Sequence, residues 1–226
     1  MSEMNVRISS DTIDGLWEVW YDRLTAQKLG DGSRDGEIRG EVINAISILD
    51  DPTRNILKSK IRNLPMRYAI GEMLWYMSGS NSLKEIQKYT DGWDRMSDDG
   101  ETVNSNYGYC IKHKFGFDQW EFVRNELEEN PNSRRAVIHI KEASDKESKD
   151  VNCTVCLQFF IRDNKLHLTT YMRSNDLWMG FPYDVFQFTN MQILMSMELG
   201  RNIGTYTHIA GSLHLYERDV KGAENG

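Results

Sequence analysis

Residues 153–176 read CTVCLQFFIRDNKLHLTTYMRSND, and the pattern in this stretch decides the fold. Two runs rich in β-branched and aromatic residues, Thr154–Arg162 and Lys165–Met172, are separated only by an Asp-Asn pair. Asp and Asn tolerate the backbone conformation of a tight two-residue turn, so the pattern predicts a β-hairpin. A hairpin brings its two ends together, and we therefore expect Cys153, before the first strand, to lie near Arg173, after the second.

A cysteine beside an arginine is a chemically sensible pair. The positive charge lowers the pKa of the thiol, and the thiolate is the nucleophilic form of cysteine. The guanidinium group can also hold an anionic substrate, because its planar fork matches phosphate oxygens. By themselves the two residues do not identify an enzyme, since buried structural cysteines are common in strands.

Helical and strand patterns continue on both sides of the hairpin. Apolar spacing, with capping and breaking residues at the ends, predicts helices over residues 11–29, 66–77, 118–129 and 182–199, and a short helix after a Ser82-x-x-Glu85 capping box. Strands are predicted over residues 37–49 and 135–140, whereas residues 91–114 are predicted to be irregular and 141–150 a solvated connection. Helices interleaved with an antiparallel hairpin indicate the α+β class rather than a doubly wound parallel sheet.

Composition limits the class of protein. The chain has 226 residues, 39% of them hydrophobic, and no internal repeat or linker, so we expect one domain over residues 1–226. Its net charge of −7 argues against broad binding to a nucleic-acid backbone. No apolar run reaches the roughly 18 residues of a membrane span, and the N-terminus has no signal pattern. With three cysteines and no disulfide framework, a reducing, cytoplasmic setting is expected.

Eight separated motifs share one order and spacing with a known family. They are GEMLW at 71–75, WD at 93–94, NSNYG at 104–108, PNSRR at 131–135, CTVCLQF at 153–159, RSND at 173–176, GFPYD at 180–184 and GSLHLY at 211–216. Together they resemble the thymidylate synthase superfamily over about residues 30 to 219. The resemblance implies a mixed, largely antiparallel twisted sheet flanked by helices, with the sheet packing at a homodimer interface.

The resemblance also implies a role for each site residue. The phosphate of a pyrimidine nucleoside monophosphate would be held by Arg34, Arg173 and Ser174 of one subunit and by Arg134 and Arg135 of the other, and the sugar by His214 and Tyr216. Trp93, Asp176 and Gly180 would contact folate, and Glu72 and Tyr107 would manage protons through ordered water. No metal is implied.

The implied reaction begins with addition of the Cys153 thiolate to C6 of the pyrimidine ring, which makes C5 nucleophilic. C5 then takes the one-carbon unit of 5,10-methylenetetrahydrofolate, and loss of tetrahydrofolate leaves an exocyclic methylene group. Hydride transfer to that methylene gives a methyl product, whereas water gives a hydroxymethyl product.

Asp184 indicates which base is bound. At this position, eleven residues after the arginine, typical thymidylate synthases carry asparagine, which pairs with O4 and N3–H of uracil. Cytosine presents an amino donor at C4 and an acceptor at N3, and a carboxylate with one shared proton matches that pattern. The motifs around Tyr107, Asp176 and His214 also resemble the hydroxymethylases of the superfamily more than the synthases. The sequence therefore predicts a cytidylate hydroxymethylase.

Several alternatives stay open. Cys153 and Cys156 with Cys110 and His113 have the spacing of a zinc site, but residues three apart on a strand point to opposite faces. Without the resemblance, Glu72 would be a packed carboxylate, Arg134 and Arg135 a solvated pair, and Asp184 a complement to the helix dipole. Functional rivals are a thymidylate synthase, a uridylate hydroxymethylase and a non-catalytic nucleotide-binding relative. The choice between ribose and deoxyribose is left open.

Overall fold

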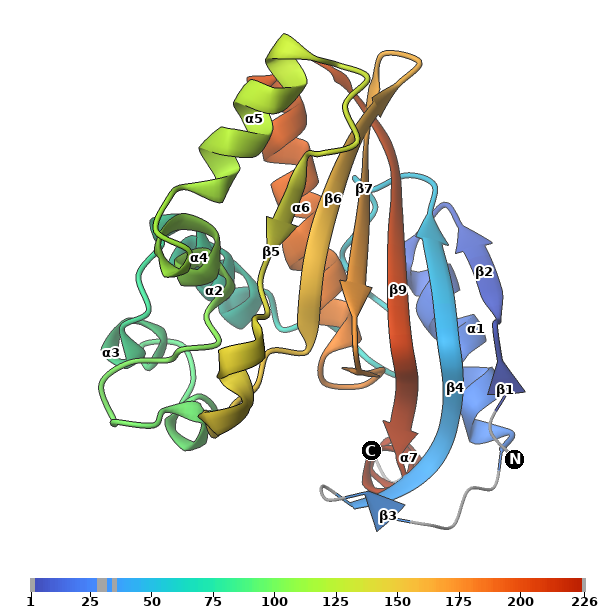
Figure 1. Cartoon of the computed structure of the whole chain (residues 1–226). Helices are drawn as coiled ribbons and strands as arrows, with labels where there is room; N and C mark the ends of the chain where they lie inside the picture. The colour runs from blue at the N-terminus through green and yellow to red at the C-terminus, as the bar shows by residue number, and fades with distance from the viewer. Residues whose placement is uncertain (1–2, 28–31, 34–35, 225–226) are drawn as a thin grey trace. The chain divides into compact units, whose positions relative to one another are not determined.

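The computed structural model describes residues 3–27, 32–33 and 36–224. The chain (Figure 1) forms two compact units. The terminal unit consists of Met1–Leu64 and Asp163–Gly226, so it holds both chain ends, and the central unit consists of residues 65–162. The expectation of a single catalytic domain stays a prediction. Among the described residues, no helix has the length and apolar character that a bilayer crossing requires.

The terminal unit is built on a mixed sheet. Its two longest strands, β4 (Gly36–Leu49) and β9 (Asn202–Tyr216), pair antiparallel and lie side by side in Figure 1. Strands β7 (Lys165–Met172) and β8 (Asn175–Asp176) both run parallel to β9. At the other edge, β1 (Glu3–Met4) and β2 (Arg7–Ser10) pair parallel with β4, and β3 (Gly32–Ser33) pairs antiparallel with it.

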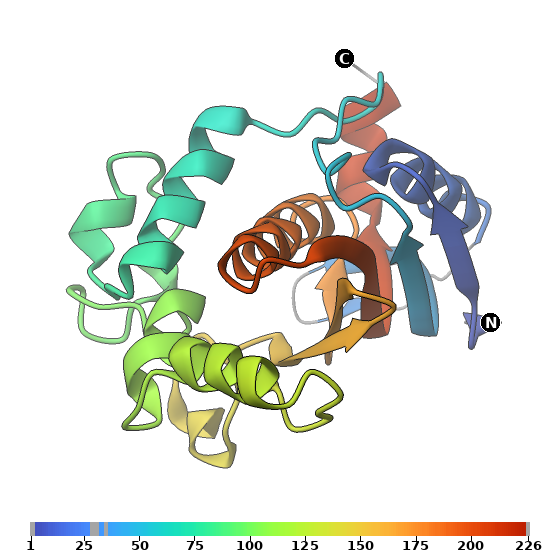
Figure 2. The same cartoon turned by 90° about the horizontal axis from the view of Figure 1, so that it is seen from above.

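Two helices cover one face of this sheet. Helix α1 (Ile13–Thr25) packs on β2 and β4, and α6 (Phe181–Glu198) packs on β7, β9 and α1; Figure 2 shows both helices from above, beside the strands. Thr12 caps α1 by accepting a hydrogen bond from the backbone N–H of Gly15. The largest fully buried side chains of this layer include Trp17, Trp20, Phe181, Phe188 and Tyr206. A further helix, α7 (Glu217–Glu224), follows β9 directly.

The central unit is mostly helical. It contains α2 (Met66–Ser78), α3 (Leu83–Ile86), a 3₁₀ turn (Asp94–Met96), α4 (Tyr107–Tyr109), a π-helical turn (Cys110–Lys114), α5 (Gln119–Glu129), β5 (Val137–His139), a second 3₁₀ turn (Ala143–Glu147) and β6 (Thr154–Arg162). Strand β5 pairs antiparallel with β6, and α5 runs beside β5 (Figure 1). Gln119 joins these parts, because its amide donates to the carbonyls of Cys110 and His139 and accepts from the N–H of His139.

Most of the expected elements are confirmed. Strands β6 and β7 have the predicted bounds, and the Asp163-Asn164 pair between them has φ of 50° and 59°, the left-handed conformation of a tight two-residue turn. Helices α2, α5 and α6 and strand β4 each begin and end within about one residue of the prediction.

Other expectations were wrong. Helix α1 ends at Thr25, four residues early, and β5 spans only three residues. The hydroxyl of Ser82 makes no capping bond, so the short helix α3 lacks the expected capping box. The last third of the segment expected to be irregular, residues 107–114, is helical, because Asn106 caps α4 by accepting from the N–H of Tyr109. Strands β1, β2, β3, β8 and β9 and helix α7 were not predicted, and β3 lies in a stretch that was expected to be a loop.

Candidate active site

Four buried residues of the terminal unit form a continuous hydrogen-bonded chain. Asn175 Nδ2 on β8 donates to Oδ2 of Asp184 in the first turn of α6, at 2.8 Å. Asn175 Oδ1 lies 3.1 Å from Nε2 of His208, and Nδ1 of His208 lies 2.8 Å from the hydroxyl of Tyr206; both of these residues are on β9. Asp184 is 9% exposed and the other three residues 3% or less. Residues of strands β8 and β9 therefore fix the position of the Asp184 side chain through these hydrogen bonds.

Burial sets the charge states of His208 and Tyr206 in this hydrogen-bonded series. It lowers the pKa of His208 to about 3 and raises that of Tyr206 well above its ordinary value, so both side chains are neutral at physiological pH. A neutral imidazole has one donor and one acceptor nitrogen. Asn175 Oδ1 can only accept, so Nε2 of His208 donates to it and Nδ1 accepts from Tyr206. Tyr206 thus donates to His208, His208 donates to Asn175, and Asn175 donates to Asp184.

The predicted sugar-binding pair lies at the end of β9. His214 is 8% exposed, and in the part of the chain that the structure describes no group hydrogen-bonds its buried Nδ1. Its ring meets that of Tyr216 edge-on, with the centroids 5.0 Å apart. A buried nitrogen without a protein partner costs free energy unless a ligand or water supplies a bond. This orphaned atom fits a polar ligand such as a sugar hydroxyl.

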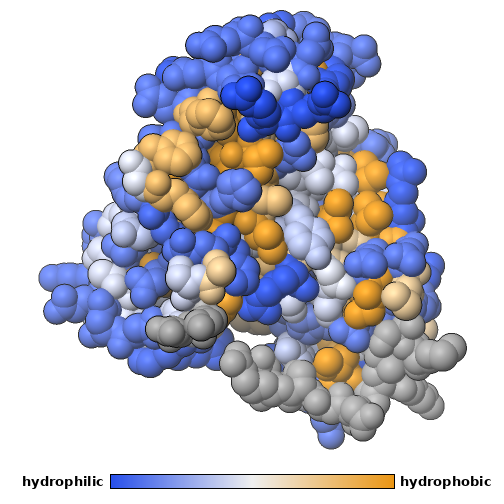
Figure 3. Space-filling model, in the orientation of Figure 1, coloured by the Kyte–Doolittle hydropathy of each residue, from blue (hydrophilic) through white to orange (hydrophobic). Residues whose placement is uncertain are grey.

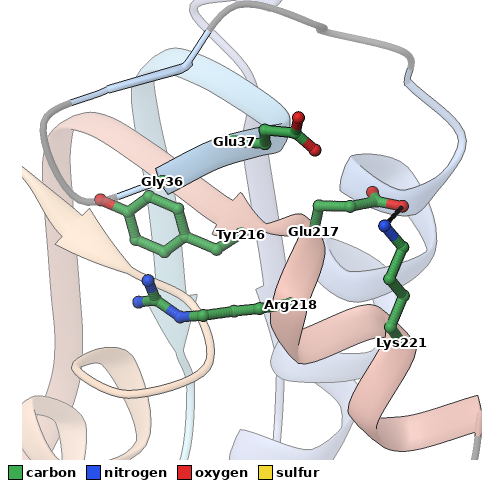
Figure 4. Close-up of a pocket in the computed structure, with 6 residues that line it drawn as sticks. All are labelled: Gly36, Glu37, Tyr216, Glu217, Arg218 and Lys221. Atoms are coloured by element: carbon green, nitrogen blue, oxygen red, sulfur yellow. Dashed lines mark ion pairs between the residues drawn. The ribbon is translucent and has the colours of Figure 1, made fainter.

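A cavity of about 220 Å³ adjoins Tyr216 (Figure 4). It is lined by Gly36, Glu37, Tyr216, Glu217, Arg218 and Lys221. The guanidinium carbon of Arg218 lies 4.3 Å from the centre of the Tyr216 ring, and Glu217 pairs with Lys221 at 3.6 Å. Of the predicted site residues that the structure describes, only Tyr216 lines this cavity, so the cavity is not the predicted nucleotide site.

The segment between β7 and α6 contains the remaining predicted residues of this unit. Asp176 Oδ1 accepts from the backbone N–H groups of Trp178 and Met179, at 2.7 and 3.1 Å, and so orders the turn into α6. A Cβ on Gly180 would lie 2.8 Å from Asn175 Nδ2 and 3.2 Å from Asp184 Oδ2, so a glycine leaves room for that hydrogen bond. Arg173 is exposed and Ser174 half-buried, whereas Arg34 lies outside the described residues.

In the central unit, Glu72 belongs to a cluster that the sequence predicted only in part. It is 4% exposed on α2, and Oε1 accepts from the hydroxyl of Tyr68 at 2.6 Å. That hydroxyl accepts from Nε1 of Trp93 at 2.9 Å, and the Trp93 ring meets that of Trp75 edge-on at 5.4 Å. Tyr68 was missed, although its spacing of four residues before Glu72 places both on one helix face. Glu72 and Trp93 are thus connected through Tyr68.

Tyr107 is the other predicted proton-managing residue, and it reaches the start of β6. Its hydroxyl accepts from Oγ1 of Thr154 at 2.9 Å, and Thr154 directly follows Cys153. Cys153 is half-buried and is not part of a disulfide. The other two cysteines are less suited to be nucleophiles, because burial raises the pKa of Cys156, and raises that of Cys110 to about 11.

The predicted phosphate ligands of this unit are on its surface. Arg134 and Arg135 are exposed, and the guanidinium group of Arg135 pairs with Glu126 at 3.5 Å. The zinc arrangement considered from the spacing of Cys153, Cys156, Cys110 and His113 is not formed: among the described residues, no three His, Cys, Asp or Glu side chains gather in a way that could hold a metal ion.

Comparison with known proteins agrees with this geometry. A family model described as thymidylate synthase matches residues 21–225. The chain belongs to the thymidylate synthase family. Members of this family are folate-dependent one-carbon transferases that use methylenetetrahydrofolate as the one-carbon donor.

Individual relatives within the thymidylate synthase family are distant. A deoxyuridylate hydroxymethyltransferase of Bacillus phage SP01 is 30% identical over 203 residues, which are 83% of this chain and 52% of that protein. A thymidylate synthase of Bacillus phage phi3T is 28% identical over 168 residues, or 70% of this chain and 60% of that protein. The chain thus spans between half and two thirds of the length of these curated relatives.

The fold is that of the thymidylate synthases. The solved structure of the thermostable thymidylate synthase A from Bacillus subtilis matches with a TM-score of 0.79 at 21% identity, covering 95% of this chain and 83% of that one. The expected α+β class, a mixed sheet flanked by helices, is confirmed. The residues present also suit a folate, because a half-exposed indole at Trp93 and a carboxylate at Asp176 offer an aromatic face and an acceptor for the N–H groups of a pterin.

Proposed function

We propose that this protein is a folate-dependent hydroxymethylase that converts (d)CMP and 5,10-methylenetetrahydrofolate, with water, to 5-hydroxymethyl-(d)CMP and tetrahydrofolate. The observation that carries the proposal is the buried carboxylate of Asp184, which stands where typical family members have asparagine. Its Oδ2 accepts a hydrogen bond from Asn175, and the carboxyl group can accept from the amino group at C4 of cytosine while one proton is shared with N3. The same carboxylate would face O4 of uracil acceptor to acceptor.

Different residues of the chain serve different steps of the proposed reaction. The Cys153 thiolate adds to C6 of the pyrimidine, which turns C5 into a nucleophile. Glu72, oriented by Tyr68, and Tyr107, beside Thr154, move protons during attack at C5 and loss of the C5 proton. When bound, 5,10-methylenetetrahydrofolate supplies the one-carbon unit at C5. Departure of Cys153 after water has added restores the aromatic ring.

The nucleotide is held by groups of fixed charge and by hydrogen bonds. The phosphate is bound by Arg34, Arg173 and Ser174 with Arg134 and Arg135 of a second copy, because guanidinium groups bind phosphate oxygens in pairs. His214 and Tyr216 bind the sugar, and the orphaned Nδ1 of His214 supports this role. Trp93, Asp176 and Gly180 contact the folate.

The second copy is that of a homodimer formed through the open face of the sheet in the terminal unit. On this face Ile46 of β4, Ile209 of β9 and Tyr171 of β7 lie in register across three strands; the two isoleucines are partly exposed and Tyr171 is 39% exposed. Figure 3 shows hydrophobic side chains gathered over β4 and β9. Three free cysteines fit a reducing compartment, and we place the protein in the cytoplasm.

A second candidate is hydroxymethylation of dUMP. It is favoured by the printed name of the Bacillus phage SP01 relative, a deoxyuridylate hydroxymethyltransferase. The two candidates share the nucleophile, the folate and the water step, and they differ only in the base that Asp184 meets.

The decisive experiment is incubation of the protein with 5,10-methylenetetrahydrofolate and, separately, dCMP, CMP or dUMP. Mass spectrometry identifies the product, and absorbance follows the folate. We expect 5-hydroxymethylcytidylate and no dihydrofolate. A methylated product with dihydrofolate, or turnover of dUMP alone, would overturn the proposal.

Substitution of the base reader gives a second test. Asp184→Asn restores the asparagine of the synthases, and we expect the ratio of kcat/KM for dCMP over dUMP to fall by about tenfold to a hundredfold, because one paired contact changes its donor pattern. Asp176→Asn, a matched change at the turn before α6, should not invert the base preference. An unaltered preference in Asp184→Asn contradicts its role as the base reader.

A further inference from the structure

The carboxylate of Glu126 is connected to Arg135 twice, once through the side chain and once through the backbone. Its Oε2 pairs with Nη2 of Arg135 at 3.5 Å. Its Oε1 accepts a hydrogen bond from the hydroxyl of Ser133 at 2.6 Å, and that hydroxyl accepts from the backbone N–H of Arg135 at 3.0 Å. The three residues therefore close a ring of interactions on one carboxylate.

The buried members of this ring hold an exposed cation. Glu126 lies in the last turn of α5, whereas Ser133 and Arg135 lie in the segment between α5 and β5. The side chain of Glu126 is 14% exposed and Ser133 is 4% exposed, but the side chain of Arg135 is 77% exposed. Arginine has five N–H donors, and the pair with Glu126 engages one of its nitrogens. The guanidinium group therefore stays accessible to an anion from solution.

The backbone of the neighbouring arginine is fixed from the other side. Nε2 of Gln158 on β6 donates to the carbonyl oxygen of Arg134 at 2.9 Å. Strand β5, which follows this segment, pairs with the same part of β6. The segment that carries both predicted phosphate ligands is thus anchored at its backbone, and Glu126 restrains the long side chain of Arg135 in addition.

We propose that Glu126 is a positioning residue that presents Arg135 to the nucleotide phosphate bound by a second copy of the chain, an inference that rests on the proposed function. A guanidinium group binds phosphate oxygens through a planar fork, so its direction matters as well as its charge. An unrestrained arginine side chain loses conformational freedom when it binds an anion. A side chain that a carboxylate already restrains loses less, which strengthens binding.

Glu126 has a second, opposing effect, because a carboxylate competes with the phosphate for the guanidinium group. This competition is weak: the arginine of the pair is exposed, and exposed ion pairs contribute little free energy in water. The restraint on the Arg135 side chain, together with the hydrogen bond that holds Ser133, therefore decides the sign. Loss of Glu126 should weaken phosphate binding.

The test compares each nucleotide with its own nucleoside, because the ratio of their dissociation constants isolates the contribution of the phosphate. Equilibrium binding of dCMP and deoxycytidine, and of dUMP and deoxyuridine, is measured for the wild type, Glu126→Ala, Glu126→Gln and Ser133→Ala. We expect the nucleoside-to-nucleotide ratio to fall by about three- to tenfold in Glu126→Ala and in Ser133→Ala. Glu126→Gln keeps an amide oxygen that can accept from Ser133, so it should lose less.

Glu121→Ala is the matched control, since Glu121 lies on the same helix and pairs with Arg124 at 3.8 Å; this variant should keep the wild-type ratio. Arg135→Ala should lower the ratio, and adding Glu126→Ala to it should cost little further, because the two residues act through one contact. An unchanged or higher ratio in both Glu126→Ala and Ser133→Ala would overturn the inference. An equal loss of nucleoside and nucleotide affinity would also overturn it, because that loss would reflect a merely structural role.

The same measurements separate the inference from the proposed function. If Arg135→Ala keeps the wild-type ratio, the proposed role of Arg135 at the phosphate fails and the inference fails with it. If Arg135→Ala lowers the ratio while Glu126→Ala and Ser133→Ala keep it, only the inference fails. A preference for dUMP would overturn the proposed cytidylate activity, but the ratio tests the role of Glu126 with either base.

Discussion

At the residue scale, Cys153 carries the proposed chemistry. Cys153 directly precedes β6. The next residue, Thr154, donates a hydrogen bond to the hydroxyl of Tyr107, so a second predicted site residue contacts the immediate neighbour of Cys153. We expect Cys153→Ser to lower turnover more than about 10³-fold, because a serine hydroxyl is not ionised near neutral pH, and to leave nucleotide affinity largely intact. Release of tritium from C5 and equilibrium binding measure the two quantities.

Cys156→Ser is the matched control for that substitution, since Cys156 is also half-buried but has a raised pKa. It should retain tritium release. Undiminished turnover in Cys153→Ser, or equal loss in both variants, would refute the assignment of the nucleophile.

At the element scale, close contact between α2 and α4 positions Tyr107. A Cβ on Gly108 would lie 1.9 Å from the carbonyl oxygen of Tyr76, a backbone atom that can move only with its helix. We expect Gly108→Ala to destabilise the protein by about 1–3 kcal/mol, the usual cost of overpacking. Denaturant unfolding measures the loss. Gly92→Ala, where the nearest atom is the Thr90 hydroxyl at 3.3 Å, should cost far less, and equal stability of the two variants would contradict the tight contact.

The elements differ in how well the sequence predicted them, for a physical reason. Strands β6 and β7 and helix α2 carry their own signals: β-branched runs around an Asp-Asn turn, and a proline before a helical pattern. The long strand β9 was missed because Gly204 and Gly211 interrupt its pattern of β-branched and aromatic residues, and its pairing with β4 and β7 on both sides is a tertiary feature. Helix α4 was missed because its cap, Asn106, lies in a stretch of residues typical of loops.

At the scale of the whole molecule, the buried His208 makes stability depend on pH. Burial lowers its pKa from 6.5 to about 3, so the unfolded chain takes up a proton below pH 6.5 that the folded chain does not bind. Stability therefore falls as the pH drops from 6.5 toward 3, and between pH 7 and pH 5 this one group accounts for about 2 kcal/mol.

His208→Gln removes this pH-dependent contribution to the free energy of unfolding. Urea unfolding of the wild type and the variant at pH 7 and pH 5 should show the wild-type advantage shrinking by about 2 kcal/mol at the lower pH. An advantage of the same size at both values would mean that His208 does not stay neutral in the folded protein.

Assembly is the other property of the whole molecule. If the open sheet face joins two copies, Ile209→Asp should yield a monomer in sedimentation experiments, since it buries charge in an apolar contact. It should also weaken nucleotide binding, because Arg134 and Arg135 would no longer reach the partner's site. Met197→Asp, at a 72% exposed methionine on α6, is the matched control and should leave assembly unchanged. A wild-type monomer at micromolar concentration would contradict the proposed dimer.

The sequence alone determined the position of the candidate nucleophile, the bounds of β6 and β7, the family resemblance and the presence of an acid at Asp184, because these depend on residue type and on short-range pattern. Only the tertiary structure decided which residues surround Asp184. Asn175 and His208 are 33 residues apart and meet only because β8 and β9 pair in a particular register. Hydrogen bonds need atoms within about 3 Å, and no local pattern in the chain encodes that distance between remote residues.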